Sequence, residues 1–197
     1  LYAPLRYQGR GLIKPHLNNY LQQLHALLHQ TNSGTPTGTL MSTAVENFRL
    51  ELGMPGLLTA TPFSGFKTAT TEGWVKSLWQ FMDQHGMTLH DPLPKLTPLR
   101  SQDKFLMELA GAFTQQHTFI QRINDCRHYL RATTLADIST GDGTKLIPDA
   151  FHLRPTYIPP ANGGIDWPKA PPYVLPEHIK IWQQMLTPSV EDTVTLK

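Results

Sequence analysis

The stretch RINDCRHYLRATTLADISTGDGTKLIPDAF, which runs from Arg122 to Phe151, is the part of the sequence that best defines the fold. Apolar residues recur there, and just before it, at intervals of three and four, namely at Phe119, Ile123, Cys126 and Leu130. That spacing predicts an α-helix with one face against a core. The Gly141-Asp142-Gly143 run predicts a tight turn, because glycine accepts the positive φ that a chain reversal needs.

Two cations stand on a neighbouring face of the same predicted helix. Arg127 and Arg131 are four residues apart, so their guanidinium groups are expected to lie side by side and to reach solvent, a carboxylate or a phosphate. A short helical turn is expected from Leu135 to Ser139, with Thr133 or Thr134 as its cap and Asp137 near its positive end.

The same periodicity predicts four helices before this stretch. They run from Pro15 to Leu28, from Thr37 or Thr39 to Leu52, from Thr71 to His85 with a threonine cap, and from a Ser101 cap through Phe113, after which Thr114 caps the helix of Ile123. The first two should form an antiparallel pair, because only the turn-rich segment 31–38 joins them. The third is aromatic around more than half of its circumference, so we expect its rings to be core residues, although they can also stack on bases.

Beyond residue 148 the sequence becomes rich in proline. Nine of the 17 prolines lie between residues 148 and 188, which indicates an extended strap. One further helix is expected to start at Pro176. We therefore predict an all-α fold of about six helices in an irregular bundle (residues 1–153), followed by a proline-rich strap with a terminal helix (residues 154–197). Three aromatic residues of the strap either anchor it to a neighbouring domain or cover the core of this one: Trp167, Tyr173 and Trp182.

Charge and composition narrow the classes of function. Residues 1–45 contain no Asp or Glu but do contain Arg6, Arg10 and Lys14, which favours a polyanionic partner; the alternative is that these cations only keep the chain soluble. No apolar run approaches the roughly 20 residues that cross a bilayer, so we expect no membrane span. A single cysteine excludes an internal disulfide and fits an intracellular protein of the cytoplasm or nucleus. Because the sequence starts at Leu1, we expect a fragment of a longer chain.

Three runs, in the same order, resemble segments downstream of the polymerase palm in the reverse-transcriptase-like proteins of retrotransposons. They are YAPLRYQGRGL at residues 2–12, GWVKSLWQFMDQHG at residues 73–86, and CRHYLRATTLADISTGDG at residues 126–143. The resemblance covers residues 1 to about 153. It implies a thumb-like, C-terminal part of a polypeptide that holds template and primer beside a polymerase, with other domains of that parent as partners.

We expect no catalysis from this chain itself. Polymerisation with two metal ions needs clustered carboxylates, and the family carries an adjacent Asp pair in its palm, whereas no Asp-Asp occurs here; the parent protein can still be an RNA-directed DNA polymerase. His25 and His29 are four residues apart, but the carboxylate of an HExxH motif is missing, so we expect neither a metal nor another cofactor.

Two functional hypotheses follow. In the first, the chain binds RNA, DNA or their hybrid through phosphate contacts, without reading bases. The residues expected to make these contacts are Arg6, Arg10, Lys14, Arg127 and Arg131. In the second, the chain is a structural or protein-interaction module of a larger polypeptide and makes no direct contact with nucleic acid. The first hypothesis gains support if the two groups of cations share one face of the molecule, and it loses most of its support if they lie on opposite sides.

Overall fold

The computed structural model describes residues 14–31, 33–56, 62–87, 89, 98, 100, 103–143, 145–154, 167, 171 and 173–191. Within these residues the chain is helical, and its β-type pairing consists of two isolated bridges, Phe105 with Thr134 and Ser139 with Leu146. The predicted all-α class is therefore confirmed. The α-helices are α1 (Pro15–Gln30), α2 (Pro36–Leu52), α3 (Phe63–Phe66), α4 (Trp74–Gln84), α5 (Leu106–Phe113), α6 (His117–Leu130), α7 (Pro148–Phe151) and α8 (Pro176–Glu191), and η2 (Leu135–Ile138) is a 3-10 helix.

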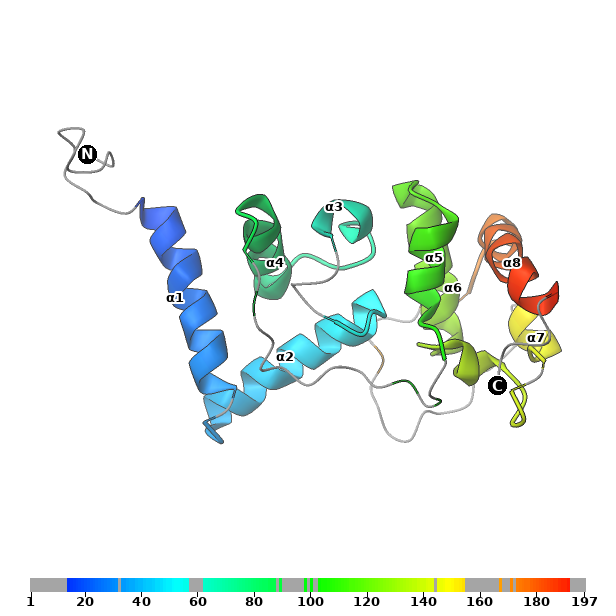
Figure 1. Cartoon of the computed structure of the whole chain (residues 1–197), viewed down its shortest axis with the longest axis horizontal. Helices are drawn as coiled ribbons and strands as arrows, with labels where there is room; N and C mark the ends of the chain where they lie inside the picture. The colour runs from blue at the N-terminus through cyan, green and yellow to red at the C-terminus, as the bar shows by residue number, and fades with distance from the viewer. Residues whose placement is uncertain are drawn as a thin grey trace.

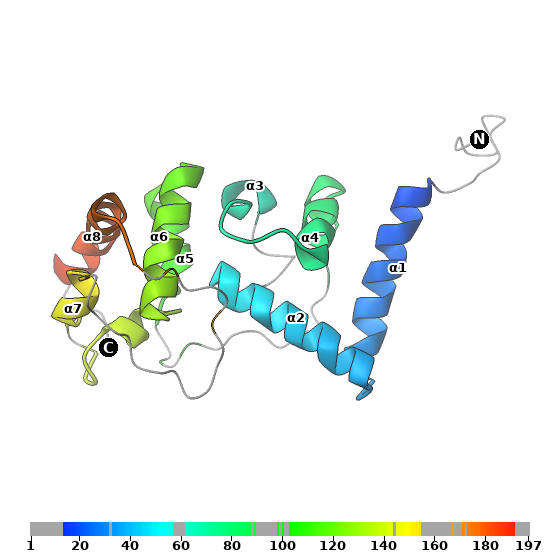
Figure 2. The same ribbon diagram turned by 180° about the vertical axis from the view of Figure 1, so that it is seen from behind.

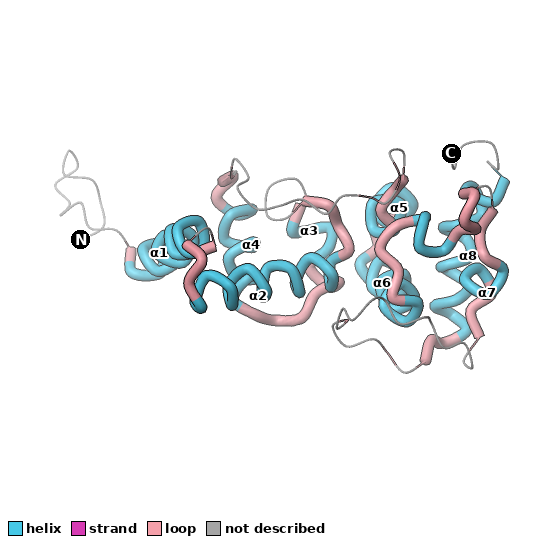
Figure 3. Tube along the Cα trace, turned by 90° about the horizontal axis from the view of Figure 1, so that it is seen from below, coloured by secondary structure: helices cyan, strands magenta, loops and turns pink. Residues whose placement is uncertain are grey.

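The helices form an elongated row (Figure 1). Helices α1 to α4 make up one end and α5 to α8 the other, and α2 runs obliquely so that its last turn points toward α6. Figure 3, seen from below, shows the same row along its length. Buried side chains from both ends belong to one continuous hydrophobic core, which holds the last turn of α2 firmly between the two groups of helices.

The first two helices contact each other, but α2 runs obliquely away from α1 instead of lying antiparallel along it (Figure 1). Helix α2 starts at Pro36, one residue before the earlier of the two predicted starts, because the Thr35 hydroxyl accepts the Gly38 N–H (3.1 Å) and proline suits the first turn. It ends at Gly53, whose φ of 69° is left-handed. Helix α1 packs on α2 and α4, and its Tyr20 ring stacks on Phe81 with centroids 4.5 Å apart.

The aromatic helix α4 lies in the core, as its spacing predicted. Trp79 is fully buried, and its ring meets the rings of Phe48 and Phe63 edge-on. The helix begins at Trp74 without a threonine cap, so that detail of the prediction is wrong. The reason is that Thr71 is held elsewhere: its N–H and hydroxyl both donate to the Glu51 carboxylate (2.6 and 3.2 Å).

Helix α6 has the predicted buried stripe, with Ile123 and Cys126 fully buried and Leu130 nearly so. Thr114 does not cap it; this residue ends α5, and α6 starts at His117. The expected cap of α5, Ser101, lies outside the described residues.

The short turn after α6 is present as η2. The Asp137 carboxylate accepts the Thr133 and Thr134 N–H groups (2.7 and 2.9 Å), as its place near the positive end of the turn predicted. Gly143 has the positive φ expected of the following reversal, at 71°.

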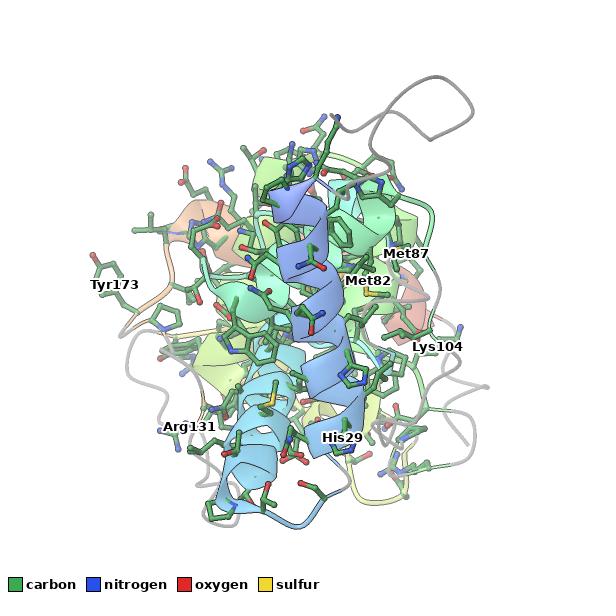
Figure 4. All side chains as sticks on the ribbon, turned by 90° about the vertical axis from the view of Figure 1, so that its left-hand side faces the viewer. His29, Met82, Met87, Lys104, Arg131 and Tyr173 are labelled. Atoms are coloured by element: carbon green, nitrogen blue, oxygen red, sulfur yellow. The ribbon has the colours of Figure 1, made fainter. Side chains whose placement is uncertain are left out.

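Helix α8 packs against α5, α6 and α7. Trp182 is fully buried, and its indole Nε1 donates to the Ala150 carbonyl (2.8 Å). Of the two alternatives for the strap, this residue therefore fits the one in which the strap covers its own core. Tyr173 points outward instead and is 60% exposed (Figure 4). The boundary at residues 153 and 154 remains a prediction.

Cys126 provides a chemical test of this core. Burial and the nearby Asp125 carboxylate raise the pKa of the thiol well above its usual range, so the reactive thiolate is suppressed. We expect no reaction with a water-soluble disulfide reagent at pH 8 in the folded protein, and one equivalent of reaction in 6 M guanidinium chloride. Stoichiometric labelling of the folded chain within minutes would place Cys126 at the surface and contradict the packing of α6.

In the described part of the chain, no helix combines the length and the apolar character needed to span a bilayer.

Candidate binding groove

The described members of the set predicted to contact phosphate do not form one surface. Arg6 and Arg10 lie outside the described residues. Lys14 is exposed just before α1, at the upper left of Figure 1, whereas α6 ends near the lower edge of the row. Figure 4, which looks along the row from the α1 end, shows Arg131 low on one side, far from the upper end where α1 begins. The described cations of the two predicted groups therefore do not share one surface: Lys14 is exposed before α1, Arg127 is buried in α6, and Arg131 follows α6.

Arg127 corrects a prediction. It was expected on a solvent-facing side of its helix next to Arg131, but it is fully buried, while Arg131 is partly exposed. Arg131 ends α6 with a left-handed φ of 55°, so the helix turns away before the two guanidinium groups can share a face. Arg127 is consequently withdrawn from the phosphate-binding set.

The Arg127 guanidinium caps the end of α2. Its Nη2 atom donates to the carbonyls of Leu50 and Glu51 (2.6 and 2.7 Å), which lie in the last helical turn and have no partner inside their own helix. Its Nε atom donates to Asn124 Oδ1 (2.9 Å) and its Nη1 atom to the Ala132 carbonyl (3.3 Å). A cation at the negative end of a helix dipole is stabilising. Because Arg127 belongs to α6 and the two carbonyls belong to α2, this contact also joins the two groups of helices in the row.

The surroundings of this guanidinium leave no spare room. A methyl group at Gly53 would lie 2.7 Å from Arg127 Cζ and Nε, and the left-handed φ there already favours glycine. The Trp167 ring lies beside the cation, with its centroid 5.5 Å from Cζ. Burial lowers the pKa of Arg127 to about 9, opposed by the attraction of Glu51 and Asp137, so the group stays charged at neutral pH.

A pocket of about 230 Å³ lies directly above this cluster, and we call it the polar pocket. Its lining is Glu51 at the end of α2, residues 68–71, and Gln121, Asn124, Asp125 and His128 on α6. Figure 2 shows the last turn of α2 next to α6 on the near side, with the chain between α3 and α4 passing above it. The pocket is therefore built where the two ends of the row meet.

A second pocket, of about 250 Å³, adjoins the first and is more apolar; we call it the apolar pocket. It is lined by Ala44, Asn47, Phe48 and Glu51 of α2 and by residues 71–76 at the start of α4. Glu51 and Thr71 belong to both pockets, and the hydrogen bonds between these two residues form the wall that separates them. We call the two adjoining pockets together the groove.

The segment that forms one wall of the groove is held from several sides. Asn124 Nδ2 donates to the Ala69 carbonyl (2.8 Å), and Lys76 Nζ donates to the Thr70 carbonyl (3.0 Å) and to the Glu72 carboxylate (2.7 Å). The Thr68 hydroxyl donates to the His117 carbonyl (3.3 Å). These bonds come from α4 and α6, so the wall does not depend on a single neighbour.

The groove is negatively charged. Its lining carries the carboxylates of Glu51, Glu72 and Asp125 and one cation, Lys76, which is paired with Glu72. Burial raises the pKa of Asp125, and the charge of His178, whose Nδ1 lies 3.7 Å from the carboxylate, opposes that shift. Arg127 lies behind the wall and offsets part of the charge of Glu51. Asp125 is thus the carboxylate with the least compensation.

One polar atom of the groove has no partner. Thr70 is 7% exposed and lines the polar pocket, yet its hydroxyl makes no hydrogen bond among the residues that the structure describes. A buried hydroxyl without a partner is disfavoured by about 1–3 kcal/mol, so such groups are uncommon in folded proteins. The oxygen itself is buried, so it reaches a ligand in the pocket only by a rotation of the Thr70 side chain.

Other candidate chemistry is not assembled. The imidazoles of His25 and His29 stack with centroids 5.9 Å apart on α1, and within the described residues no group of three or more His, Cys, Asp or Glu side chains is arranged to hold a metal.

Sequence reasoning missed the groove because its walls come from three segments that are far apart in the chain and carry no shared motif. The threonines at 68, 70 and 71 gave the nearest signal, because they crowd polar groups into a segment flanked by buried apolar residues. Neither a protein family, nor a curated protein, nor a solved structure matches this chain.

Proposed function

We propose that the chain is a non-catalytic protein-interaction module, whose groove binds an extended segment of a partner polypeptide. The observation that carries this proposal is the anionic lining of the groove, in which the Asp125 carboxylate has the least compensation. A phosphate brought to the same place would meet the carboxylates of Asp125 and Glu51, and like charges in a partly buried site repel strongly.

The nucleic-acid hypothesis competes with this proposal and remains a prediction. Without Arg127 it rests on Arg6, Arg10, Lys14 and Arg131, and the two described members of that set are separated along the molecule. The resemblance to the region downstream of a reverse-transcriptase palm also remains a prediction. It agrees with an interaction module, because that region belongs to a larger polypeptide with other domains to contact.

A displayed library of random twelve-residue peptides, selected on the purified chain, tests the proposal. We expect enriched peptides, and we expect their binding to fall at least tenfold when Asn47→Trp places a large ring in the apolar pocket. Asn47 is exposed on α2, so the fold should tolerate the change. Thr39→Trp is the matched control, because Thr39 is exposed on the same helix but does not line the groove.

The same preparations should be titrated with duplex DNA and RNA–DNA hybrid at several salt concentrations. Phosphate binding would appear as affinity that falls with salt, with a slope of log affinity against log salt of about −0.9 for each phosphate contact on B-form duplex. Failure to enrich any peptide, together with such a slope, would overturn the interaction module in favour of nucleic-acid binding. Enriched peptides that bind the Asn47→Trp variant equally well would place the binding surface elsewhere.

A further inference from the structure

Most of the donors that line the polar pocket are already in use. Asn124 Nδ2 donates to the Glu51 and Ala69 carbonyls, and the N–H and hydroxyl of Thr71 donate to the Glu51 carboxylate. The Nε2 atom of His128 lies 2.6 Å from Arg127 Nη2 and 2.9 Å from the Glu51 carbonyl, so it also faces these inner partners. Among the described lining groups, the exposed Gln121 amide and the buried Thr70 hydroxyl are donors with no hydrogen bond of this kind.

The acceptors, by contrast, remain open to a ligand. The Asp125 carboxylate has His178 beside it at 3.7 Å, which compensates its charge only when the imidazole is protonated. The Thr70 hydroxyl can accept as well as donate. A pocket rich in acceptors and negative charge matches a group that only donates and is positively charged, and among side chains lysine and arginine have this character.

Size and position add a second requirement. At about 230 Å³ the polar pocket is smaller than the roughly 300–1,000 Å³ of typical small-molecule sites, which suits one side chain of a longer ligand. The adjoining apolar pocket contains Phe48, Trp74 and Val75, which suit an apolar side chain. In an extended segment, side chains on one face recur every second residue, about 6–7 Å apart, so neighbouring pockets are filled by residues i and i+2.

We propose that the groove recognises an extended partner segment carrying a lysine or arginine two residues from an apolar side chain, with the cation in the polar pocket beside Asp125 and Thr70 and the apolar residue in the apolar pocket. This inference rests on the proposed function and specifies its ligand. The cation compensates the Asp125 carboxylate, which has His178 as its nearby partner at 3.7 Å, and can donate to the Thr70 hydroxyl oxygen once that side chain rotates toward the pocket.

The test uses blocked, fluorescein-labelled twelve-residue peptides that place Leu-Ser-Lys, or the reverse order Lys-Ser-Leu, within a Gly-Ser background. Fluorescence anisotropy should show binding by at least one order. Replacing the peptide lysine by glutamine should weaken binding at least tenfold, whereas arginine should keep it within about threefold. Replacing the peptide leucine by serine should also weaken binding. No detectable binding of either order at millimolar concentration would overturn the proposal.

Variants of the protein identify the pocket. Asp125→Asn should weaken binding of the lysine peptide about tenfold and leave binding of the glutamine peptide unchanged, so that the changes in protein and peptide are energetically coupled. Asp149→Asn is the matched control, because Asp149 is an exposed carboxylate on α7 away from the groove. Equal effects of Asp125→Asn on both peptides would show that the cation does not meet this carboxylate and would reject the assignment.

Thr70→Val provides a second test, because the affinity for the lysine peptide would not change if Thr70 had only a structural role. The valine has the same shape, and the hydroxyl that it removes has no partner in the protein, so the melting temperature should be unchanged or higher. Affinity for the lysine peptide should nevertheless fall several-fold, and unchanged affinity would contradict the role given to Thr70. If the random library yields groove-binding peptides without a lysine or arginine preference, this inference fails while the interaction module stands; if it yields none, the module itself fails.

Discussion

Replacing Arg127 by glutamine is expected to lower the free energy of unfolding by about 3–5 kcal/mol, although the sequence alone would place this arginine among replaceable surface cations. The loss arises because the Leu50 and Ala132 carbonyls would lose the guanidinium as their donor and the Glu51 carbonyl would keep only its other neighbours, at a largely buried site. Urea denaturation followed by circular dichroism measures it. For a chain of this size the change corresponds to a fall in Tm of roughly 10 °C or more.

Arg131→Gln is the matched control. Arg131 is partly exposed at the end of the same helix, and its replacement should change stability by about 1 kcal/mol or less. The stability of the Arg127→Lys variant should lie between those of the two glutamine variants. The lysine ammonium keeps the charge but lacks the planar guanidinium that reaches several carbonyls together. Equal stability of the Arg127→Gln and Arg131→Gln variants would mean that the guanidinium does not cap α2.

Replacing Trp182 by alanine should lower the free energy of unfolding by a similar amount, about 3–5 kcal/mol, because a fully buried ring and its hydrogen bond to Ala150 are lost together. We expect α8 to detach before the rest of the fold, since an isolated helix of this length is marginal in water. Limited proteolysis should then release the segment after residue 173, while the helices around Ile123 stay protected.

Tyr173→Ala supplies the comparison for this variant. Tyr173 is 60% exposed, so its truncation should alter stability by about 0.5 kcal/mol or less. Trp182→Phe should lose less stability than Trp182→Ala, because most of the ring volume remains while the indole N–H donor is missing. If Trp182→Ala were as stable as Tyr173→Ala, the terminal helix would not be part of this core, and anchoring to a neighbouring domain would become the better interpretation.

The sequence predicted the long helices well, because each of them carries a face of apolar residues at helical spacing. The stripe of Ile123, Cys126 and Leu130 is buried as expected, and the helix beginning at Pro176 is present. Helices α3 and α7 were not predicted. Each has four residues, which is too short for periodicity to be visible and too short to be stable without the packing of the folded chain.

The position of Arg127 could not be predicted for a different reason. Spacing alone placed it beside Arg131 on a polar face, but α6 is covered on more than one side, with α5 and α8 both packed against it. Its main partners are backbone carbonyls 76 and 77 residues earlier, and every residue type has such a carbonyl. The same reason hides the groove, whose walls become neighbours only when the end of α2 reaches α6.

Glu51 takes part in both the interior and the groove. Its backbone carbonyl accepts from Arg127 and Asn124, and its side chain holds Thr71 in the wall between the pockets. A wall held this way is preorganised: a partner that enters the groove meets side chains whose conformational entropy was lost when the chain folded. The entropic cost of forming a complex then falls on the incoming segment, so cyclising that segment in its bound shape should strengthen binding more than any added contact with the wall.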